Sequence, residues 1–270
     1  MIRQNLHTHT VFDDGTATPM AMAQAALDAG LESLGFSAHS TLPYRDNCEI
    51  KPGQMPAYLV AVREAKEAFR GRLSVYNGLE WDSTCVLPDI EFDYIIGSIH
   101  HIVKDGQYLS IDFKPQVTRD ILDIHFRGDK TAMLEAYFAQ YEPVAQTPRV
   151  DIVGHFDLIS KFDQVAHLFD GGDASYRDCA MAAMEKLLAA DKIFEVNTGA
   201  MSRGYRTAPY PAIPLLKAFR EMGFGAVITS DCHDGRYLDH YFAESAELLK
   251  ACGFKEKYVL TEEGFVPAQL

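Results

Sequence analysis

Short apolar runs alternate along the chain with longer segments in which apolar residues recur at helical spacing. The apolar runs have the length of buried strands, and most are separated by a segment long enough to form a helix. Because strands separated by helices pair in parallel through crossover connections, the pattern predicts an α/β barrel of about seven units. The predicted strands lie near 2–9, 33–39, 73–80, 93–100, 150–156, 193–198 and 225–231, and the predicted helices near 19–30, 55–70, 131–146, 173–190, 211–222 and 239–252.

Two segments do not follow the alternation. Residues 104–130 have the least regular pattern and begin with a turn signal, Lys-Asp-Gly-Gln. A long loop on such a scaffold is either a lid or substrate-binding element or a surface insertion, and both interpretations stay open. Residues 258–267 are expected to form a terminal hairpin or tail without a chemical role.

Length and composition favour one domain spanning residues 1–270. The 270 residues compare with about 250 in a typical α/β barrel, and 47% hydrophobic residues suffice for a large core. A net charge of −13, without any run of Lys and Arg, argues against a nucleic-acid binder. No apolar run reaches the roughly 18 residues of a membrane span, and no signal peptide is evident. The 5 scattered cysteines fit a reducing compartment, so we expect a cytoplasmic protein without disulfides, of unknown oligomeric state.

Side chains that bind metals follow most of the predicted strands. The carboxyl ends of the strands in an α/β barrel form the face that carries the chemistry, so these side chains are expected to converge there. The sequence therefore predicts a metal-dependent hydrolase. The candidate ligands at strand ends are His7, His9, His39, Glu80, His100, His155, Asp231 and His233.

The spacing within two of these motifs strengthens the metal interpretation. His7 and His9 are two residues apart, which places both imidazoles on one face of a strand, and Asp231 and His233 repeat that spacing. Zn²⁺, Mn²⁺ and Fe²⁺ all accept imidazole nitrogen. The two oxygens of Glu80 could bridge two such ions. Cys232 would face the opposite way, as a small buried hydrophobic residue.

Neighbouring residues leave some choices to be made. Of the adjacent His100 and His101, at most one can face the site, and His100 is preferred. Of Asp13 and Asp14, one could reach a metal while the other serves as a turn or cap residue. Three histidines away from strand ends are expected not to be ligands: His125, His167 and His240.

Taken together, the candidate ligands resemble the PHP (polymerase and histidinol phosphatase) superfamily over nearly the whole chain. The resemblance is carried by His7-Thr8-His9-Thr10 with Asp14-Gly15, by His39, Glu80, His100 and His155, and by Asp231-Cys232-His233. The resemblance implies a distorted (β/α)7 barrel with three metal ions. It implies a first metal at His7, His9, Glu80 and Asp231, a second at Glu80, His100 and His155, and a third at Asp14, His39 and His233. It also implies phosphate-binding basic residues, for which this sequence offers Arg203, Lys161 (where Arg is common) and Arg206.

The activity implied by the resemblance is hydrolysis of a small phosphomonoester, L-histidinol phosphate, in histidine biosynthesis. Three divalent ions, whether zinc, iron or manganese, would outweigh the three carboxylates and attract phosphate, and a metal-bridging hydroxide would attack phosphorus. Glu80, Asp231 and His233 are the expected catalytic residues, with the proton donor left open. The alternatives are nucleotide, phosphodiester or phosphotyrosine hydrolysis, an amidohydrolase-like deacylase, and a non-catalytic metal-binding barrel.

Overall fold

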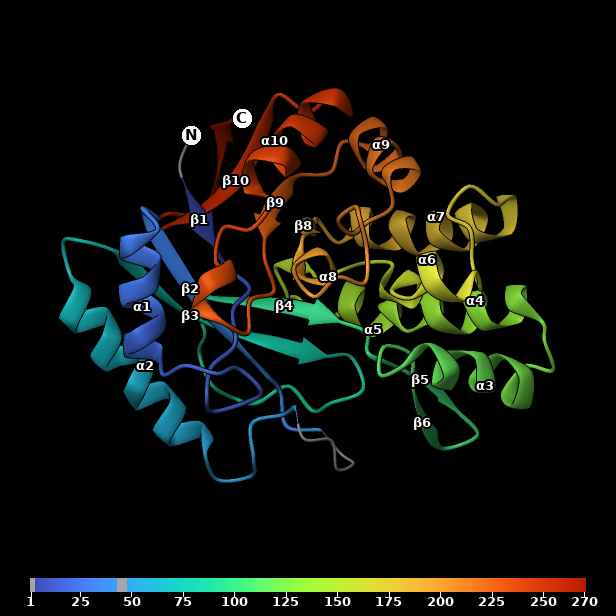
Figure 1. Cartoon of the computed structure of the whole chain (residues 1–270), viewed down its shortest axis with the longest axis horizontal. Coiled ribbons are helices and arrows are strands. Elements are labelled where there is room, and N and C mark those ends of the chain that lie inside the picture. The colour runs from blue at the N-terminus through green and yellow to red at the C-terminus, as the bar shows by residue number, and fades with distance from the viewer. Residues whose placement is uncertain (1–2, 43–47) are drawn as a thin grey trace.

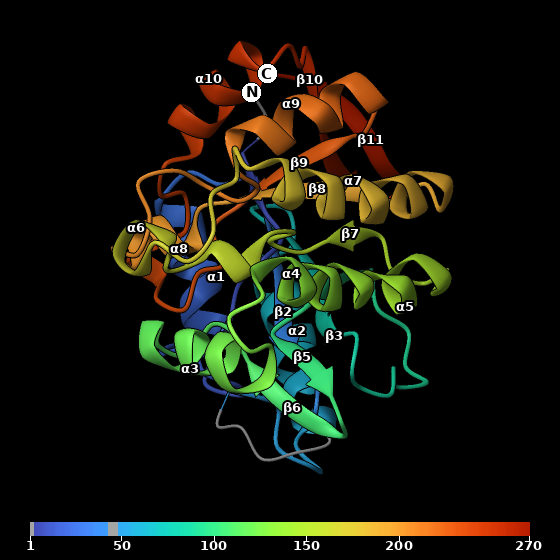
Figure 2. The same ribbon diagram turned by 90° about the vertical axis from the view of Figure 1, so that its right-hand side faces the viewer.

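Seven parallel strands form the centre of the molecule, in the computed structural model that describes residues 3–42 and 48–270. Neighbouring strands are joined by crossovers, and helices surround them (Figures 1 and 2). This confirms the predicted α/β barrel. In sheet order the strands are β1 (Gln4–Asn5), β2 (Ser33–His39), β3 (Ser74–Asp82), β4 (Tyr94–Ser98), β7 (Ile152–Val153), β8 (Ile193–Asn197) and β9 (Ala226–Thr229).

The barrel is nearly closed between its first and last strands. Beyond the ends of β1 and β9, Thr8 pairs in parallel with Cys232. The Cys232 amide donates to the His7 carbonyl at 3.1 Å, and the His9 amide donates to the Cys232 carbonyl at 2.9 Å. This pairing sets the two ligand motifs of the sequence side by side, although they are more than 220 residues apart.

An apolar layer fills the barrel beneath that junction. Its buried side chains come from four strands or strand extensions and from the C-terminal hairpin, and Tyr94 donates a hydrogen bond to the Leu6 carbonyl. The layer gives the strand ends a rigid floor, because packed apolar side chains leave little room for movement. The fully buried members are Leu6, Tyr94, Ile96, Ile152, Val227 and Leu260.

Most predicted helices are present within a few residues of their expected ends. The first shows why: the Thr18 hydroxyl accepts from the Ala21 amide at 3.2 Å, Pro19 occupies the first turn, and Gly30 follows with φ of 76°. The helices are α1 (Pro19–Asp28), α2 (Met55–Phe69), α3 (Pro115–His125), α4 (Lys130–Ala139), α5 (Tyr141–Gln146), α6 (Asp163–Ala166), α7 (Ala174–Ala189), α8 (Gly199–Ser202), α9 (Ile213–Met222) and α10 (Phe242–Ala251), with 3₁₀ turns η1 (Leu158–Ser160) and η2 (Gly235–Tyr237).

Some predicted boundaries were wrong. The helix expected at 131–146 is two helices, α4 and α5, because Pro143 cannot supply an amide to Ala139 and its ring crowds that carbonyl. The strands expected at 2–9 and 150–156 are much shorter; residue 2 lies outside the described residues.

The segment 104–130 is not the irregular loop that was expected. The strands β5 (His101–Lys104) and β6 (Gln107–Ser110) form an antiparallel hairpin that continues into α3. The predicted turn is confirmed, since Asp105 and Gly106 both have positive φ, as a tight two-residue hairpin turn requires. Figure 1 shows this hairpin and helix at one end of the barrel.

The predicted terminal hairpin is also present. It consists of β10 (Glu256–Thr261) and β11 (Gly264–Gln269), and the Gln4 side chain bonds both backbone groups of Leu260. These bonds fasten the hairpin to the start of β1. Within residues 3–42 and 48–270, no helix has both the length and the apolar character needed to cross a membrane.

Candidate metal centre

The structure brings all nine predicted metal ligands together at the carboxyl ends of the barrel strands. His39 is the last residue of β2 and Glu80 lies near the end of β3, while the others lie in the segments just beyond a strand. Their nitrogen and oxygen atoms form four overlapping groups whose members lie within 4.8 Å of one another. The groups are His9, Asp14, His39 and His233; His7, Glu80 and His155; His7, His9 and Asp231; and His39, Glu80 and His100.

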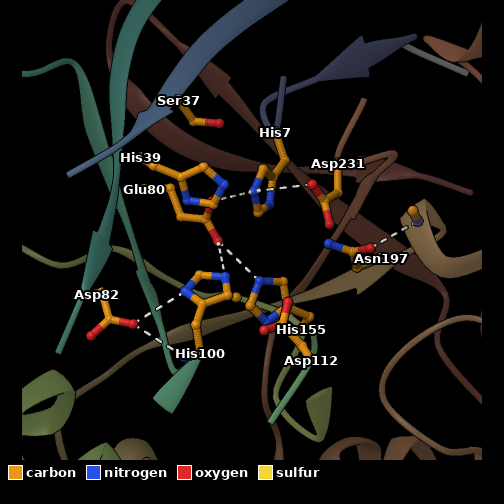
Figure 3. A network of polar contacts seen from close by, with 12 residues as sticks. His7, Ser37, His39, Glu80, Asp82, His100, Asp112, His155, Asn197 and Asp231 are labelled. Atoms are coloured by element: carbon orange, nitrogen blue, oxygen red, sulfur yellow. Dashed lines mark hydrogen bonds and ion pairs between the residues drawn. The ribbon is translucent and has the colours of Figure 1, made fainter. Parts of the chain in front are cut away.

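Glu80 occupies the centre of this cluster and is almost completely buried. Its Oε2 atom lies 3.1 Å from His7 Nε2 and 2.9 Å from His39 Nδ1. Its Oε1 atom lies 2.9 Å from His155 Nε2 and 3.4 Å from His100 Nε2 (Figure 3). Each carboxylate oxygen therefore faces a different pair of imidazoles, which is the geometry of a carboxylate that bridges two cations.

Several polar atoms in the cluster are buried without a hydrogen-bond partner among the described residues. They include the Nε2 atoms of His7 and His9, Oδ1 of Asp14 and Oε2 of Glu80. Buried polar atoms are almost always hydrogen-bonded, so unsatisfied atoms gathered at one place indicate a binding site for a ligand such as a cation. Imidazole and carboxylate donors at this spacing fit divalent ions such as zinc, iron and manganese.

The charges of the metal-free cluster balance one another. Burial opposes ionisation of Glu80, but His39, His7 and His100 hold the pKa of its carboxyl well below the usual value. Burial also opposes protonation of His7, but Glu195 and Glu80 raise its pKa well above the usual value. In the protein without metal, a proton on His7 thus takes the place of a cation.

Asp231 has a positively charged neighbour besides the histidines. Burial raises the pKa of its carboxyl, while Arg203 and then His7 lower it, and the net result is well below the usual value. Arg203 Nη2 lies 3.0 Å from Asp231 Oδ2, and its Nη1 lies 3.1 Å from His233 Nδ1. Asp231 also has a φ of 46°, an unusual backbone conformation for a residue other than glycine.

A cavity of about 450 Å³ opens onto the cluster, which is a size suited to one small molecule. Asp231, His233 and two of the three predicted substrate-binding residues, Arg203 and Lys161, line it. Arg206 does not. Its guanidinium donates to the Ser160 carbonyl and lines a neighbouring cavity, so the expectation that it reaches the substrate is not supported.

The remaining histidines lie outside the donor groups found among the described residues. His125, His167 and His240 occur in none of the four. His101 begins β5 and is buried, with its Nδ1 atom 4.0 Å from Asp82 Oδ2, so it belongs to the surroundings of the cluster. Cys232 is buried in the apolar cluster beneath α1, which agrees with its predicted outward orientation.

Comparison with known proteins identifies the family. Residues 5–199 match the PHP domain family. The chain belongs to the PHP family. It is 31% identical to a probable histidinol-phosphatase of Deinococcus radiodurans over 258 aligned residues. The alignment covers 92% of this chain and 92% of that protein. It is 24% identical to the histidinol-phosphatase of Bacillus subtilis, covering 86% of this chain and 94% of that protein.

A solved structure shares the fold. Histidinol phosphate phosphatase from Lactococcus lactis, in complex with zinc, L-histidinol and phosphate, superposes with a TM-score of 0.73. The match has 18% sequence identity and covers 98% of this chain and 99% of the other. As a PHP protein with this buried donor cluster, the chain is a metal-dependent phosphoesterase.

A surrounding layer of carboxylates in this PHP protein was not predicted as part of the site. Glu195 Oε2 lies 2.9 Å from His7 Nδ1, Asp13 Oδ2 lies 2.6 Å from His9 Nδ1, and Asp82 Oδ2 lies 3.1 Å from His100 Nδ1. Such partners fix the ring orientation and the tautomer, and leave the other nitrogen free for a metal.

The sequence carried only weak signals for these three carboxylates. Glu195 lies on a predicted strand, where an inward-facing charge would have been a clue. Asp82 is two residues after Glu80 and so shares its face of β3. Asp13 was expected to be a turn residue, and it does accept a hydrogen bond from the Thr10 amide at 2.8 Å in addition to its bond with His9.

Proposed function

We propose that this protein is a phosphomonoesterase that hydrolyses L-histidinol phosphate to L-histidinol and phosphate in histidine biosynthesis. The observation that carries the proposal is the nine-ligand cluster at the floor of a cavity sized for one small molecule. The relative from D. radiodurans, similar over 92% of the chain, supports the choice of substrate.

We propose that the cluster holds three divalent ions of zinc, iron or manganese, and the four overlapping donor groups support this number. We assign a first ion to His7, His9, Glu80 and Asp231, a second to Glu80, His100 and His155, and a third to Asp14, His39 and His233. When bound, such ions lower the pKa of water and neutralise charge on a phosphate. Zinc in the L. lactis enzyme is consistent with this chemistry.

The chain's own residues then have distinct tasks. Glu80 holds two groups of histidines at a fixed separation, through one oxygen each. Arg203 lies on the cavity wall beside Asp231 and can donate to the oxygens of a phosphate. Asp231 and His233 face the same cavity, where each would hold an ion beside the phosphate of the substrate.

The proposal is tested with a panel of substrates on the metal-loaded protein. The panel contains L-histidinol phosphate, nucleoside monophosphates, phosphotyrosine and a phosphodiester, and kcat/KM is measured for each. We expect L-histidinol phosphate to be preferred, and activity to disappear when a chelator removes the metals and to return when they are restored. Preference for any other member of the panel would refute the substrate assignment.

A further inference from the structure

Asp112 places a negative charge in the cavity that is proposed to bind phosphate. It follows β6 in the segment that leads into α3, and its side chain is 24% exposed. It lines the same cavity as His100, His155 and Arg203, and Figure 3 draws it close to the cluster. It occurs in none of the donor groups found among the described residues, so metal binding does not explain it.

Asp112 is paired with Lys161 on the cavity wall. Lys161 Nζ donates to the backbone carbonyl of Asp112 at 2.8 Å and to its Oδ2 atom at 3.2 Å. The pair sets one negative and one positive charge next to each other at the cavity, with Arg203 as a second positive charge. A carboxylate here repels a phosphate, so the wall complements a ligand that itself carries both charges.

The carboxylate has capacity for a further donor. A carboxylate offers about four lone-pair sites. Here Oδ2 accepts from Lys161, and Oδ1 accepts a long bond of 3.3 Å from the Ser110 hydroxyl. The neighbouring Phe113 also lines the cavity and is 62% exposed, which provides an apolar surface beside the charge.

We propose that Asp112 binds a protonated amine on the leaving group and so selects phosphomonoesters of amino alcohols. The inference rests on the proposed function, because it concerns the substrate of the same site. It gives the hairpin β5–β6 and the segment after it a role in recognition: the hairpin positions Asp112 opposite Lys161. A substrate with phosphate at one end and ammonium nearby would satisfy both charges at once.

The test uses two substrates that differ only in the amine. L-Histidinol phosphate carries it, and 3-(imidazol-4-yl)propyl phosphate lacks it. In Asp112→Asn we expect kcat/KM for L-histidinol phosphate to fall by about 10- to 100-fold, which is typical of a lost charge-assisted hydrogen bond. The value for the amine-free compound should change by less than about threefold, since Lys161 keeps its bond to the backbone carbonyl.

A matched variant controls for the loss of one charge from the hairpin. Asp105→Asn changes the exposed turn of the same hairpin, where φ is 50° and asparagine is well tolerated. It should leave kcat/KM for both substrates as in the wild type. Metal content and far-UV circular dichroism of both variants are compared with the wild type.

Several outcomes would overturn the inference. An equal fall for both substrates in Asp112→Asn would mean that Asp112 acts only by placing Lys161, and no fall for either would mean that it does not touch the substrate. The wild type gives an independent measure, because a kcat/KM ratio near one between the two substrates overturns the inference while leaving the phosphatase assignment intact. Failure to hydrolyse either compound overturns the proposed function and the inference together.

Discussion

At the scale of single residues, Glu80 has the most demanding position in the site. Its two oxygens serve different histidines, and one of them, Oε2, is buried without a hydrogen-bond partner in residues 3–42 and 48–270. We expect Glu80→Gln to lower the bound metal and to reduce phosphatase turnover by at least about 100-fold, because an amide nitrogen cannot ligate a cation. Metal analysis and kcat on the purified variant provide the check.

A matched control separates the role of Glu80 from the loss of a charge. Glu67→Gln in α2 removes an exposed carboxylate that forms an ion pair with Arg70, so both metal content and turnover should stay at the wild-type values. Full metal content together with full activity in Glu80→Gln would contradict the bridging role.

Glu195 contacts two of the cluster histidines: its Oε2 lies beside His7 Nδ1, and its Oε1 accepts a hydrogen bond from the His155 amide. It is fully buried, and its carboxylate also accepts from the Thr229 hydroxyl at 2.8 Å. In Glu195→Gln the imidazole of His7 loses its ionised partner, and we expect metal affinity to weaken by about 10- to 100-fold. The measurement is a metal titration, followed by kcat at saturating metal. Because Glu195 positions a ligand, excess metal should restore most of the turnover; unchanged affinity would rule this role out.

At the scale of elements, the first residue of α8, Gly199, packs closely against Asp231, which follows β9. A Cβ atom added at Gly199 would lie 2.8 Å from Asp231 Cβ and 3.0 Å from Arg203 Nη2. Gly199→Ala should therefore displace Asp231, reduce kcat by at least about tenfold and cost about 1–3 kcal/mol in the free energy of unfolding. Denaturant unfolding and steady-state kinetics measure the two effects.

The comparison for this variant is Gly172→Ala. There the added carbon meets only the exposed Asp170 carboxylate at 3.2 Å, which can move aside, so kcat should not change. If Gly199→Ala retained wild-type kcat, the close packing of α8 against Asp231 would not matter for activity.

The elements also show how far local signals reach. The helix α1 could be predicted because its cap, its first-turn proline and its terminal glycine all lie within one short stretch of sequence. The hairpin β5–β6 could not, although its Asp-Gly turn was recognised, because each strand has only four residues and carries polar side chains. Strands that short form because they pair with the strand across the turn, and the composition of each strand alone does not reveal that pairing.

At the scale of the whole molecule, barrel closure turns scattered residues into a site. The convergence of the strand-end side chains could be predicted because buried strands leave an apolar signature, and each of these side chains lies at the end of one or just after it. The sharing of His7, His9, His39 and Glu80 between donor groups depends on distances across the barrel. Those distances are set by the pairing of Thr8 with Cys232 and by the side chains beneath, which no local pattern encodes.

His9 makes the free energy of unfolding depend on pH, because its pKa is set by the charges of the whole cluster. Burial opposes its protonation, but Asp13, Asp231 and Asp14 raise its pKa from 6.5 to about 10 in the metal-free protein. A raised pKa means that the folded state holds the proton more tightly than the unfolded state. The stability from this group is therefore fully present below pH 6.5 and is lost as the pH rises toward about 10.

Metal binding should remove that dependence, because a cation bound to the deprotonated imidazole takes the place of the proton. We expect the melting temperature of the chelator-treated protein to fall between pH 6.5 and about 9.5, while that of the metal-loaded protein changes little. The difference between the two forms should therefore grow with pH, as measured by scanning calorimetry at several pH values. A difference that shrinks as the pH rises would show that the buried histidines do not exchange protons for metal.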